Sequence, residues 1–314
     1  MRTVFFGTPD LAVPSLSALA RRHEVVGLVC QPDRPSGRGK VLTPPPTKIW
    51  ALEHGIPVIQ PQKLNDGTFE KWLREQAPEV CGLTAYGRIL KQPILDVAPH
   101  GILNMHPSLL PLYRGPSPIQ SAIINGETET GISIMRLTLD MDAGDILLQE
   151  RVSIDSQDDG VTLSARLAEK GAEMLCDAID AIAAGEARYT PQNHSNATYC
   201  RLIEKRDGQI DWNKPGRAIQ NLVRGALPWP VAQTNFRGQV LRILKVALEL
   251  DSDPASQSIP GTIVTVEKSR LRVQTGDGYI SLVTLQPPGK KPMAIGDFLR
   301  GHSISAGERF ENFS

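Results

Sequence analysis

The chain has 314 residues, of which 40% are hydrophobic, 22% charged and 5% aromatic. This length allows two domains with separate cores, and the composition excludes collagen-like, low-complexity and disordered proteins. The net charge is zero, but residues 1–200 hold 18 basic and 23 acidic residues, whereas residues 201–314 hold 16 and 11. The excess of +5 in the second part fits either ordinary solvated faces or a basic domain that faces a polyanion.

Cysteines and apolar runs define the expected compartment. No CxxC pair occurs among the four cysteines, which are Cys30, Cys81, Cys176 and Cys200. This spacing argues against a disulfide framework or a zinc ribbon, so we expect reduced thiols. The apolar run Val4–Phe6 is too short for a signal peptide, and no run approaches the roughly 20 residues of a membrane helix. We therefore expect a cytoplasmic protein without membrane contact.

Strands and helices alternate through the first half of the chain. Apolar segments predict strands at 2–6, 25–30, 58–59, 80–84, 101–105, 131–136 and 146–154. Helical patterns occupy 11–21, 47–54, 69–76 and 162–184. This order is typical of an α/β fold with a Rossmann-like, mostly parallel sheet, whose ligand sites lie at the carboxyl ends of the strands.

The pattern changes after a polar segment. Residues 186–205 lose apolar periodicity, and we place a linker at 189–205 between domains of residues 1–188 and 206–314. A helix near 214–224 is then followed by short predicted strands at 231–236, 240–246, 261–266, 271–275 and 279–285. Short strands joined by glycine-containing turns predict an OB-like β-barrel in the C-terminal domain.

Two polar stretches stand out as chemical candidates. Asn104 and His106 are two residues apart on a predicted strand, so a carboxamide and an imidazole point the same way and can donate hydrogen bonds to one oxygen. Local turn bonds are the alternative. Asp140, Asp142 and Asp145 could hold a metal or lie in a solvated turn, but no second cluster supplies further ligands, so we expect no metal.

Two segments together resemble a known family. NMHPSLLPLYRGPSPIQ (104–120) and ETGISIMRLTLDMDAGDIL (129–147) resemble the formyltransferases that use 10-formyltetrahydrofolate. The resemblance implies that Asn104, His106 and Asp142 are catalytic and that the folate is a co-substrate. Asp142 is chosen over Asp140 because Ala143-Gly144-Asp145 keeps the family's register.

The same resemblance implies a folate site near the catalytic residues. Ser108–Pro111 follows His106 with only Pro107 between them, and the end of the strand at 80–84 lies at the same predicted edge. Residues 113–115 are expected to shape the site. The residues expected to contact folate are Ser108, Leu109, Leu110, Pro111, Ala85, Tyr86 and Gly87.

Further segments indicate which acceptor the chain is expected to formylate. QPDRPSGRGKVLTPPPTK (31–48) resembles an inserted loop of the members that formylate methionyl-tRNA, and 207–215, 277–291 and 298–302 resemble their C-terminal domain. This implies formylation of the α-amino group of initiator methionyl-tRNA for initiation of protein synthesis. We expect a monomer, because nothing in the sequence demands a larger assembly. The expected tRNA-binding residues are Arg34, Arg38, Lys40, Lys205, Arg206, Lys245, Lys290 and Lys291, with Arg38 closest to the end of the acceptor stem.

Two other functions stay open at this stage. The chain could formylate a small amine, such as an amino sugar or a purine precursor, but such an acceptor leaves the basic loop and the C-terminal domain without a role. It could also be an RNA-binding protein with an inactive catalytic half, which the intact Asn104, His106 and Asp142 set disfavours.

Overall fold

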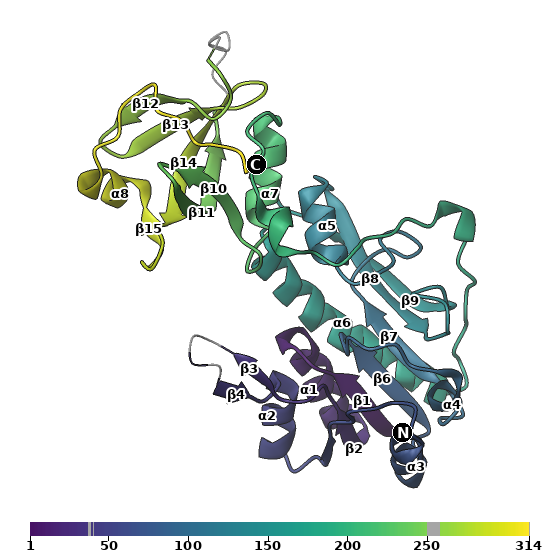
Figure 1. The fold of residues 1–314 in the computed structure, drawn as a ribbon. Helices are drawn as coiled ribbons and strands as arrows, with labels where there is room; N and C mark the ends of the chain where they lie inside the picture. Colours follow the sequence, from purple (N-terminus) through teal and green to yellow (C-terminus); the bar gives the residue numbers. More distant parts are fainter. Residues whose placement is uncertain (37–38, 40, 250–257, 314) are drawn as a thin grey trace. The chain divides into compact units, whose positions relative to one another are not determined.

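A computed structural model of the protein describes residues 1–36, 39, 41–249 and 258–313 (Figure 1). The chain divides into two compact units. The first holds residues 1–118, 129–153 and 164–201, and the second holds 119–128, 154–163 and 202–314. Two short segments that precede residue 164 therefore belong to the second unit.

A seven-stranded sheet forms the centre of the first unit. Its spatial order is β5 (Val58–Ile59), β2 (Glu24–Val29), β1 (Arg2–Gly7), β6 (Val80–Thr84), β7 (Ile102–His106), β8 (Glu129–Arg136) and β9 (Ile146–Ser153). The pairs from β5 to β7 are parallel, and the pairs β7–β8 and β8–β9 are antiparallel. The predicted mostly parallel sheet is confirmed.

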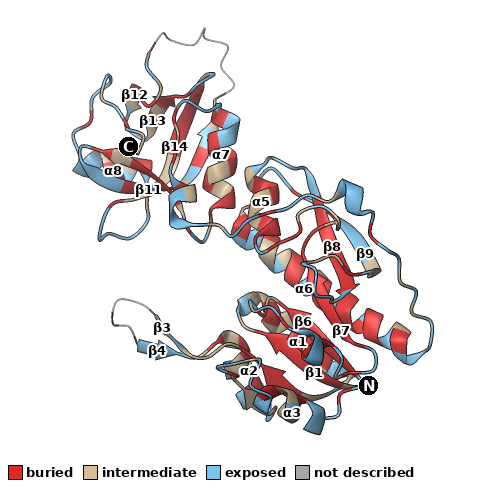
Figure 2. Cartoon of the chain, turned by 45° about the vertical axis from the view of Figure 1, so that its right-hand side comes forward, coloured by how far each residue is buried: buried red, intermediate tan, exposed pale blue. Residues whose placement is uncertain are grey.

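Helices cover both faces of this sheet. The helices of the first unit are α1 (Val13–Arg22), α2 (Pro46–Glu53), α3 (Thr68–Glu75), α4 (Gln92–Leu95) and most of α6 (Gly160–Ala183), and the 3-10 turn η1 (Asp10–Ala12) precedes α1. Helix α5 (Pro118–Ile124) lies almost entirely in the second unit. On one face, a Cβ at Gly82 would lie 3.0 Å from Leu19 of α1 and 3.4 Å from Leu175 of α6. On the other, Phe6 packs edge-on against Phe69 of α3, with ring centroids 6.1 Å apart. Burial on both faces explains why these strands are apolar throughout, as the buried β1, β6 and β7 in Figure 2 illustrate.

The insertion between β2 and α2 contains a regular element that the sequence pattern did not predict. Strands β3 (Arg34–Ser36) and β4 (Val41–Thr43) form a small antiparallel hairpin. Its base is held by Lys48, whose Nζ lies 2.8 Å from Oδ1 of Asp33 and 2.8 Å from Oε1 of Gln60. The charge of Lys48 is therefore paired within the protein.

The second unit is built on an antiparallel sheet. Its strands follow the order β10 (Ala232–Phe236), β11 (Gln239–Leu248), β14 (Tyr279–Gln286), β13 (Arg270–Gln274) and β12 (Ile263–Glu267), with β15 (Met293–Ala294) on β14. The helices of this part are α7 (Gly216–Gly225) and α8 (Ile295–Gly301), together with the 3-10 turn η3 (Lys205–Gly208). The 3-10 turn η2 (His194–Asn196) belongs to the first unit. The predicted C-terminal β domain is confirmed, and its sheet is antiparallel.

The C-terminal tail joins the two edges of this sheet. Glu311 exchanges backbone hydrogen bonds with Asn235 of β10, and Arg309 bridges Thr262 at the start of β12. Phe310, between them, is fully buried against Phe236 and Trp212, with ring centroids 4.9 and 5.5 Å away. The tail thus covers edge strands that would otherwise present unpaired backbone groups, and it gives the sheet its barrel-like closure.

Candidate active site

The carboxyl half of β7 carries the polar side chains that the sequence singled out. Asn104 is 7% exposed and lies opposite Leu83 of β6 and Met135 of β8. His106, two residues further on, lies opposite Ser133 of β8. Within the described part of the chain, the Asn104 carboxamide has no hydrogen-bond partner. Buried polar side chains normally have hydrogen-bond partners in the protein. The unpartnered amide of Asn104 is therefore available to hydrogen-bond a ligand.

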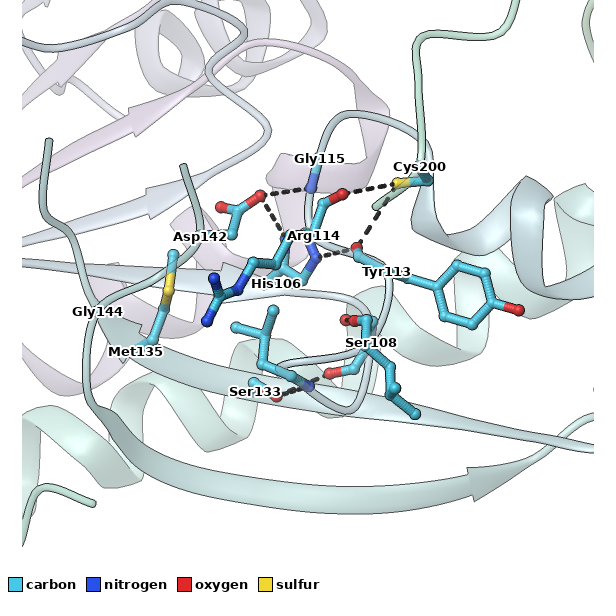
Figure 3. A network of polar contacts seen from close by, with 12 residues as sticks. His106, Ser108, Tyr113, Arg114, Gly115, Ser133, Met135, Asp142, Gly144 and Cys200 are labelled. Atoms are coloured by element: carbon cyan, nitrogen blue, oxygen red, sulfur yellow. Dashed lines mark hydrogen bonds and ion pairs between the residues drawn. The ribbon is translucent and has the colours of Figure 1, made fainter. Parts of the chain in front are cut away.

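The His106 ring lies between two oxygen acceptors (Figure 3). Nε2 is 3.0 Å from the carbonyl oxygen of Tyr113, and Nδ1 is 3.7 Å from Oδ2 of Asp142. The same carboxylate oxygen accepts a 2.8 Å hydrogen bond from the backbone N–H of Gly115. Two acceptors facing the two ring nitrogens suit an imidazolium ring, which has an N–H on each nitrogen.

The loop that supplies Asp142 has an uncommon backbone conformation. Asp142 has φ +48°, in the left-handed region that few residues other than glycine adopt. Two residues later, a Cβ at Gly144 would lie 1.8 Å from the carbonyl oxygen of Arg136, so only glycine allows this close approach. The exposed Asp140 lies in the same loop, but it is Asp142 whose carboxylate the fold brings to His106.

The loop is also held from a segment that follows α6. Nε2 of Gln192 donates hydrogen bonds to the carbonyl oxygens of Asp142 at 2.9 Å and Gly144 at 2.7 Å. Oε1 of Gln192 accepts from Nε of Arg114 at 3.1 Å and from its Nη2 at 2.6 Å. Both side chains are buried. Sequence reasoning missed Gln192, since it lies in a polar segment without periodicity.

Comparison with known proteins places this geometry in a family. Residues 1–179 match the formyl transferase family model, and residues 202–303 match the model of the formyl transferase C-terminal domain. The chain belongs to the formyl transferase family. It is 44% identical over 303 residues to methionyl-tRNA formyltransferase of Chloroflexus aurantiacus, covering 96% of this chain and 97% of the relative. It is also 41% identical over 314 residues to methionyl-tRNA formyltransferase of Sulfurihydrogenibium sp., covering 99% and 100%.

Solved structures of other proteins share the fold. An N-formyltransferase from Helicobacter canadensis, in complex with folinic acid and dTDP-3-aminofucose, has a TM-score of 0.68 and 20% identity, covering 91% of this chain and 99% of its own. HypX from Aquifex aeolicus, in complex with tetrahydrofolic acid, has a TM-score of 0.66 and 16% identity, covering 95% and 47%. At these identities the likeness concerns the fold alone.

In this member of the family, the turn after His106 is tied to the sheet (Figure 3). Ser133 Oγ donates to the carbonyl oxygen of Ser108 at 2.7 Å and accepts from the N–H of Leu110 at 3.1 Å. Ser108 and Leu110 are buried, whereas Leu109 and Pro111 are partly exposed. Leu109 and Pro111 are therefore more accessible to a folate than the other two residues of this turn.

The turn after β6 is tied to two neighbouring strand ends. The carbonyl oxygen of Tyr86 accepts hydrogen bonds from Oγ1 of Thr8 at 3.1 Å and from Nε2 of Gln31 at 2.9 Å. Burial raises the pKa of Tyr86 to about 12. The flanking Ala85 and Gly87 have φ of +48° and +78°. These contacts join the carboxyl ends of β1, β2 and β6, while Ala85 retains some exposure.

The basic residues predicted to bind tRNA are divided between the two compact units. Arg34 is exposed in β3 and donates a hydrogen bond to Gln31, whereas Arg38 and Lys40 lie outside the described residues. In the second unit, Lys205 and Arg206 lie in η3, and Arg206 is paired with Glu204 at 2.9 Å.

The other three predicted basic residues are exposed in the antiparallel sheet domain. Lys245 is in β11, and Lys290 and Lys291 follow β14. Irregular register in β11 places Lys245 and Arg242 on the same exposed side, although they are three residues apart. Gln286 links this side to the loop, because its Nε2 donates to the carbonyl of Lys290 at 2.8 Å and its Oε1 lies 3.5 Å from Nη1 of Arg242. Arg242 is a basic neighbour that the prediction omitted.

The described residues contain no group of three metal-ligating side chains arranged to hold an ion. Across residues 1–36, 39, 41–249 and 258–313, no helix has the length and apolar character that spanning a bilayer requires.

Proposed function

We propose that this chain transfers a formyl group from 10-formyltetrahydrofolate to the α-amino group of initiator methionyl-tRNA. The observation that carries this proposal is the end-to-end similarity to methionyl-tRNA formyltransferases, which extends through both units. The folate-bound structures of related fold support the choice of co-substrate. Residues 1–188 perform the chemistry, and residues 206–314, with their basic side chains, bind the RNA backbone.

The reaction moves one carbon between two nitrogens. The lone pair of the α-amine forms a bond to the formyl carbon, the bond between that carbon and N10 breaks, and the amine proton is balanced by a proton gained at N10. During addition the formyl oxygen becomes negative, so fixed donors aimed at it lower the barrier. Asn104 supplies an N–H without a protein partner, and an imidazolium at His106 adds positive charge beside it.

Asp142 serves His106 in this mechanism. Its carboxylate lies on the Nδ1 side of the ring, where the N–H of Gly115 holds the carboxylate and Gln192 holds the backbone carbonyl of the same residue. A carboxylate at this place stabilises the positive ring and can accept the amine proton through water. Leu109, Pro111 and the backbone at Ala85, beside the ends of β7 and β6, form the wall for the folate, with Ser108, Leu110, Tyr86 and Gly87 holding that wall in shape.

The first experiment is formyl transfer from 10-formyltetrahydrofolate to methionyl-initiator tRNA, methionyl-elongator tRNA and free methionine. Product on the initiator tRNA alone supports the proposal. Transfer to none of these acceptors overturns it and directs the search to small amines. A His106→Ala variant should lose turnover and retain tRNA binding. Equal loss of both would mean that the site is misplaced.

Binding to tRNA is tested separately by its salt dependence. Phosphate contacts release counterions, so affinity should fall steeply between about 50 and 200 mM salt. Arg34, Arg38 and Lys40 of the insertion, Lys205 and Arg206 of η3, and Lys245, Lys290 and Lys291 of the sheet are the proposed contacts. Replacing Lys290 and Lys291 by alanine should weaken binding and reduce the salt slope. An unchanged slope would remove them from the interface.

A further inference from the structure

We propose that Gln192 is a positioning residue for catalysis, acting through Asp142. This inference rests on the proposed function. Gln192 lies in the segment that the sequence suggests is a linker, yet it is 5% exposed and belongs to the same compact unit as Asn104 and His106. Backbone bonds fasten its segment to the unit on both sides, between Thr190 and Ile146 and between Cys200 and Arg114.

The chemistry of a carboxamide is needed at this position. Its NH₂ group donates to the carbonyl oxygens of Asp142 and Gly144, and its oxygen accepts two N–H groups of Arg114. No other uncharged side chain of this length offers two donors on one arm and an acceptor on the other. Arg114 sets the direction of the amide, because a guanidinium cannot face an NH₂ group.

Arg114 is itself firmly placed. Its guanidinium is buried, and besides Gln192 it contacts Nδ1 of His194 at 3.0 Å and Oη of Tyr199 at 3.5 Å, neither of which is a carboxylate. Loss of any of these acceptors would leave an N–H of the buried guanidinium without a hydrogen bond, which is energetically costly. The Gln192 oxygen is therefore held strongly by Arg114. The orientation of the NH₂ group toward the Asp142 loop follows from that bond.

The Asp142 loop requires such support. Asp142 has φ +48°, a conformation that persists only where surrounding contacts hold it. Gly115 holds the carboxylate, and Gln192 holds the backbone carbonyl of the same residue. Without Gln192, the loop can relax toward an ordinary conformation and carry the carboxylate away from His106. A displacement of about 1 Å is expected to lower kcat about 10- to 100-fold.

The test uses Gln192→Glu in the full-length enzyme. This isosteric change keeps an acceptor for Arg114 and replaces both donors with an oxygen that repels the two carbonyls. We expect kcat to fall about 10- to 100-fold, with the KM values for folate and tRNA within about twofold of wild type. Gln192→Met, which removes every polar contact, should lower kcat at least as far. Wild-type kcat in either soluble, folded variant would overturn the inference.

A matched control separates positioning from general stability. Gln274 of the second unit is another buried glutamine, and its Nε2 donates to the carbonyls of Thr275 at 3.0 Å and Gly278 at 3.1 Å. Gln274→Glu should lower the melting temperature comparably and leave kcat at saturating tRNA unchanged. A similar loss of kcat in both variants would show that only stability is being measured, against the inference.

A double-mutant cycle tests the route through Asp142. In an Asp142→Asn background, Gln192→Glu should lower single-turnover rates by less than about twofold, because the group being positioned is already gone. If the two losses multiply, Gln192 does not act through Asp142 and the inference fails. Absence of formyl transfer in the wild type would instead refute the proposed function, so the two failures are distinguishable.

Discussion

The backbone N–H of Gly115 and the carboxylate of Asp142 are joined by a 2.8 Å hydrogen bond, and the oxygen that accepts it is the one nearest to Nδ1 of His106. The carboxylate is thus oriented by the main chain of one loop, while the imidazole it faces belongs to a strand. Gly115 has φ +118°, and this conformation aims its N–H at the carboxylate.

Gly115→Ala should disrupt the site by two physical effects. The left-handed backbone is strained for alanine, and the new Cβ would lie 2.2 Å from the carbonyl oxygen of Cys200. We expect the free energy of unfolding to fall by about 2–5 kcal/mol and kcat to fall with it. Gly55→Ala is the control, because Gly55 has φ +70° and nothing within 4 Å, so only strain of about 1 kcal/mol applies. Equal losses in urea unfolding would contradict this account.

Asn104→Ala should affect the reaction far more than the fold. Its carboxamide has no recorded hydrogen bond in the described part of the chain, so removing it breaks no protein contact. Loss of one oxyanion donor typically lowers kcat about 10²- to 10³-fold. Steady-state kinetics and thermal unfolding measure both effects, with exposed Asn65→Ala as a control. A kcat within tenfold of wild type would remove Asn104 from the catalytic set.

The base of the insertion should make stability depend on pH. Hydrogen bonds from Lys48 and Gln60 lower the pKa of Asp33. A carboxyl group with a lowered pKa in the folded state stabilises the protein above its unfolded pKa of about 4, and this stabilisation is lost as the pH falls through the folded value.

The melting temperature of Asp33→Asn should therefore decrease less than that of wild type between about pH 5 and pH 2. Lys48→Met, which removes the cation instead, should flatten the curve in the same way. If the melting temperatures of wild type and both variants change with pH in parallel, this cluster does not contribute to the pH dependence of stability.

The buried thiols should be unreactive in the native protein. Burial raises the pKa of Cys81 and Cys176 to about 12 and that of Cys30 to about 11. At pH 8 a thiol with a pKa of 12 is ionised to only about one part in 10⁴, and the thiolate is the reactive form. We expect these three cysteines to resist a chromogenic disulfide reagent until guanidinium is added. If one equivalent of thiol reacts rapidly in the native wild type and this rapid phase is absent in Cys81→Ser, Cys81 is not buried as described.

Removal of Phe310 should unfold the second unit selectively. Its ring fills the space between Trp212 and Phe236, and truncation of a buried phenylalanine costs about 3–5 kcal/mol. Phe310→Ala should lower the urea midpoint followed by tryptophan fluorescence. Phe313→Ala, at a partly exposed position, should have a smaller effect. Similar midpoints for the two variants would mean that the tail does not hold the sheet closed.

Local patterns in the sequence predicted the fold class for physical reasons. The strands β1, β6 and β7 are buried on both faces, so their apolar runs are visible without any partner. The hairpin of β3 and β4 was missed because its strands are only three residues long. The short helix α8 was missed as well, since one or two turns present too few residues for a helical period to emerge.

The sequence by itself determined the strand and helix alternation, and it placed Asn104 and His106 on one side of a strand, because side-chain direction alternates with a fixed period of two. The resemblance of residues 104–147 to a family added Asp142. Only the tertiary structure decided that Gly115 and Gln192 hold Asp142 in place. Gln192 is fifty residues from Asp142 along the chain. Periodicity indicates which face of its own helix or strand a residue occupies. A hydrogen bond between residues so far apart in the sequence depends instead on how the loops pack against the sheet.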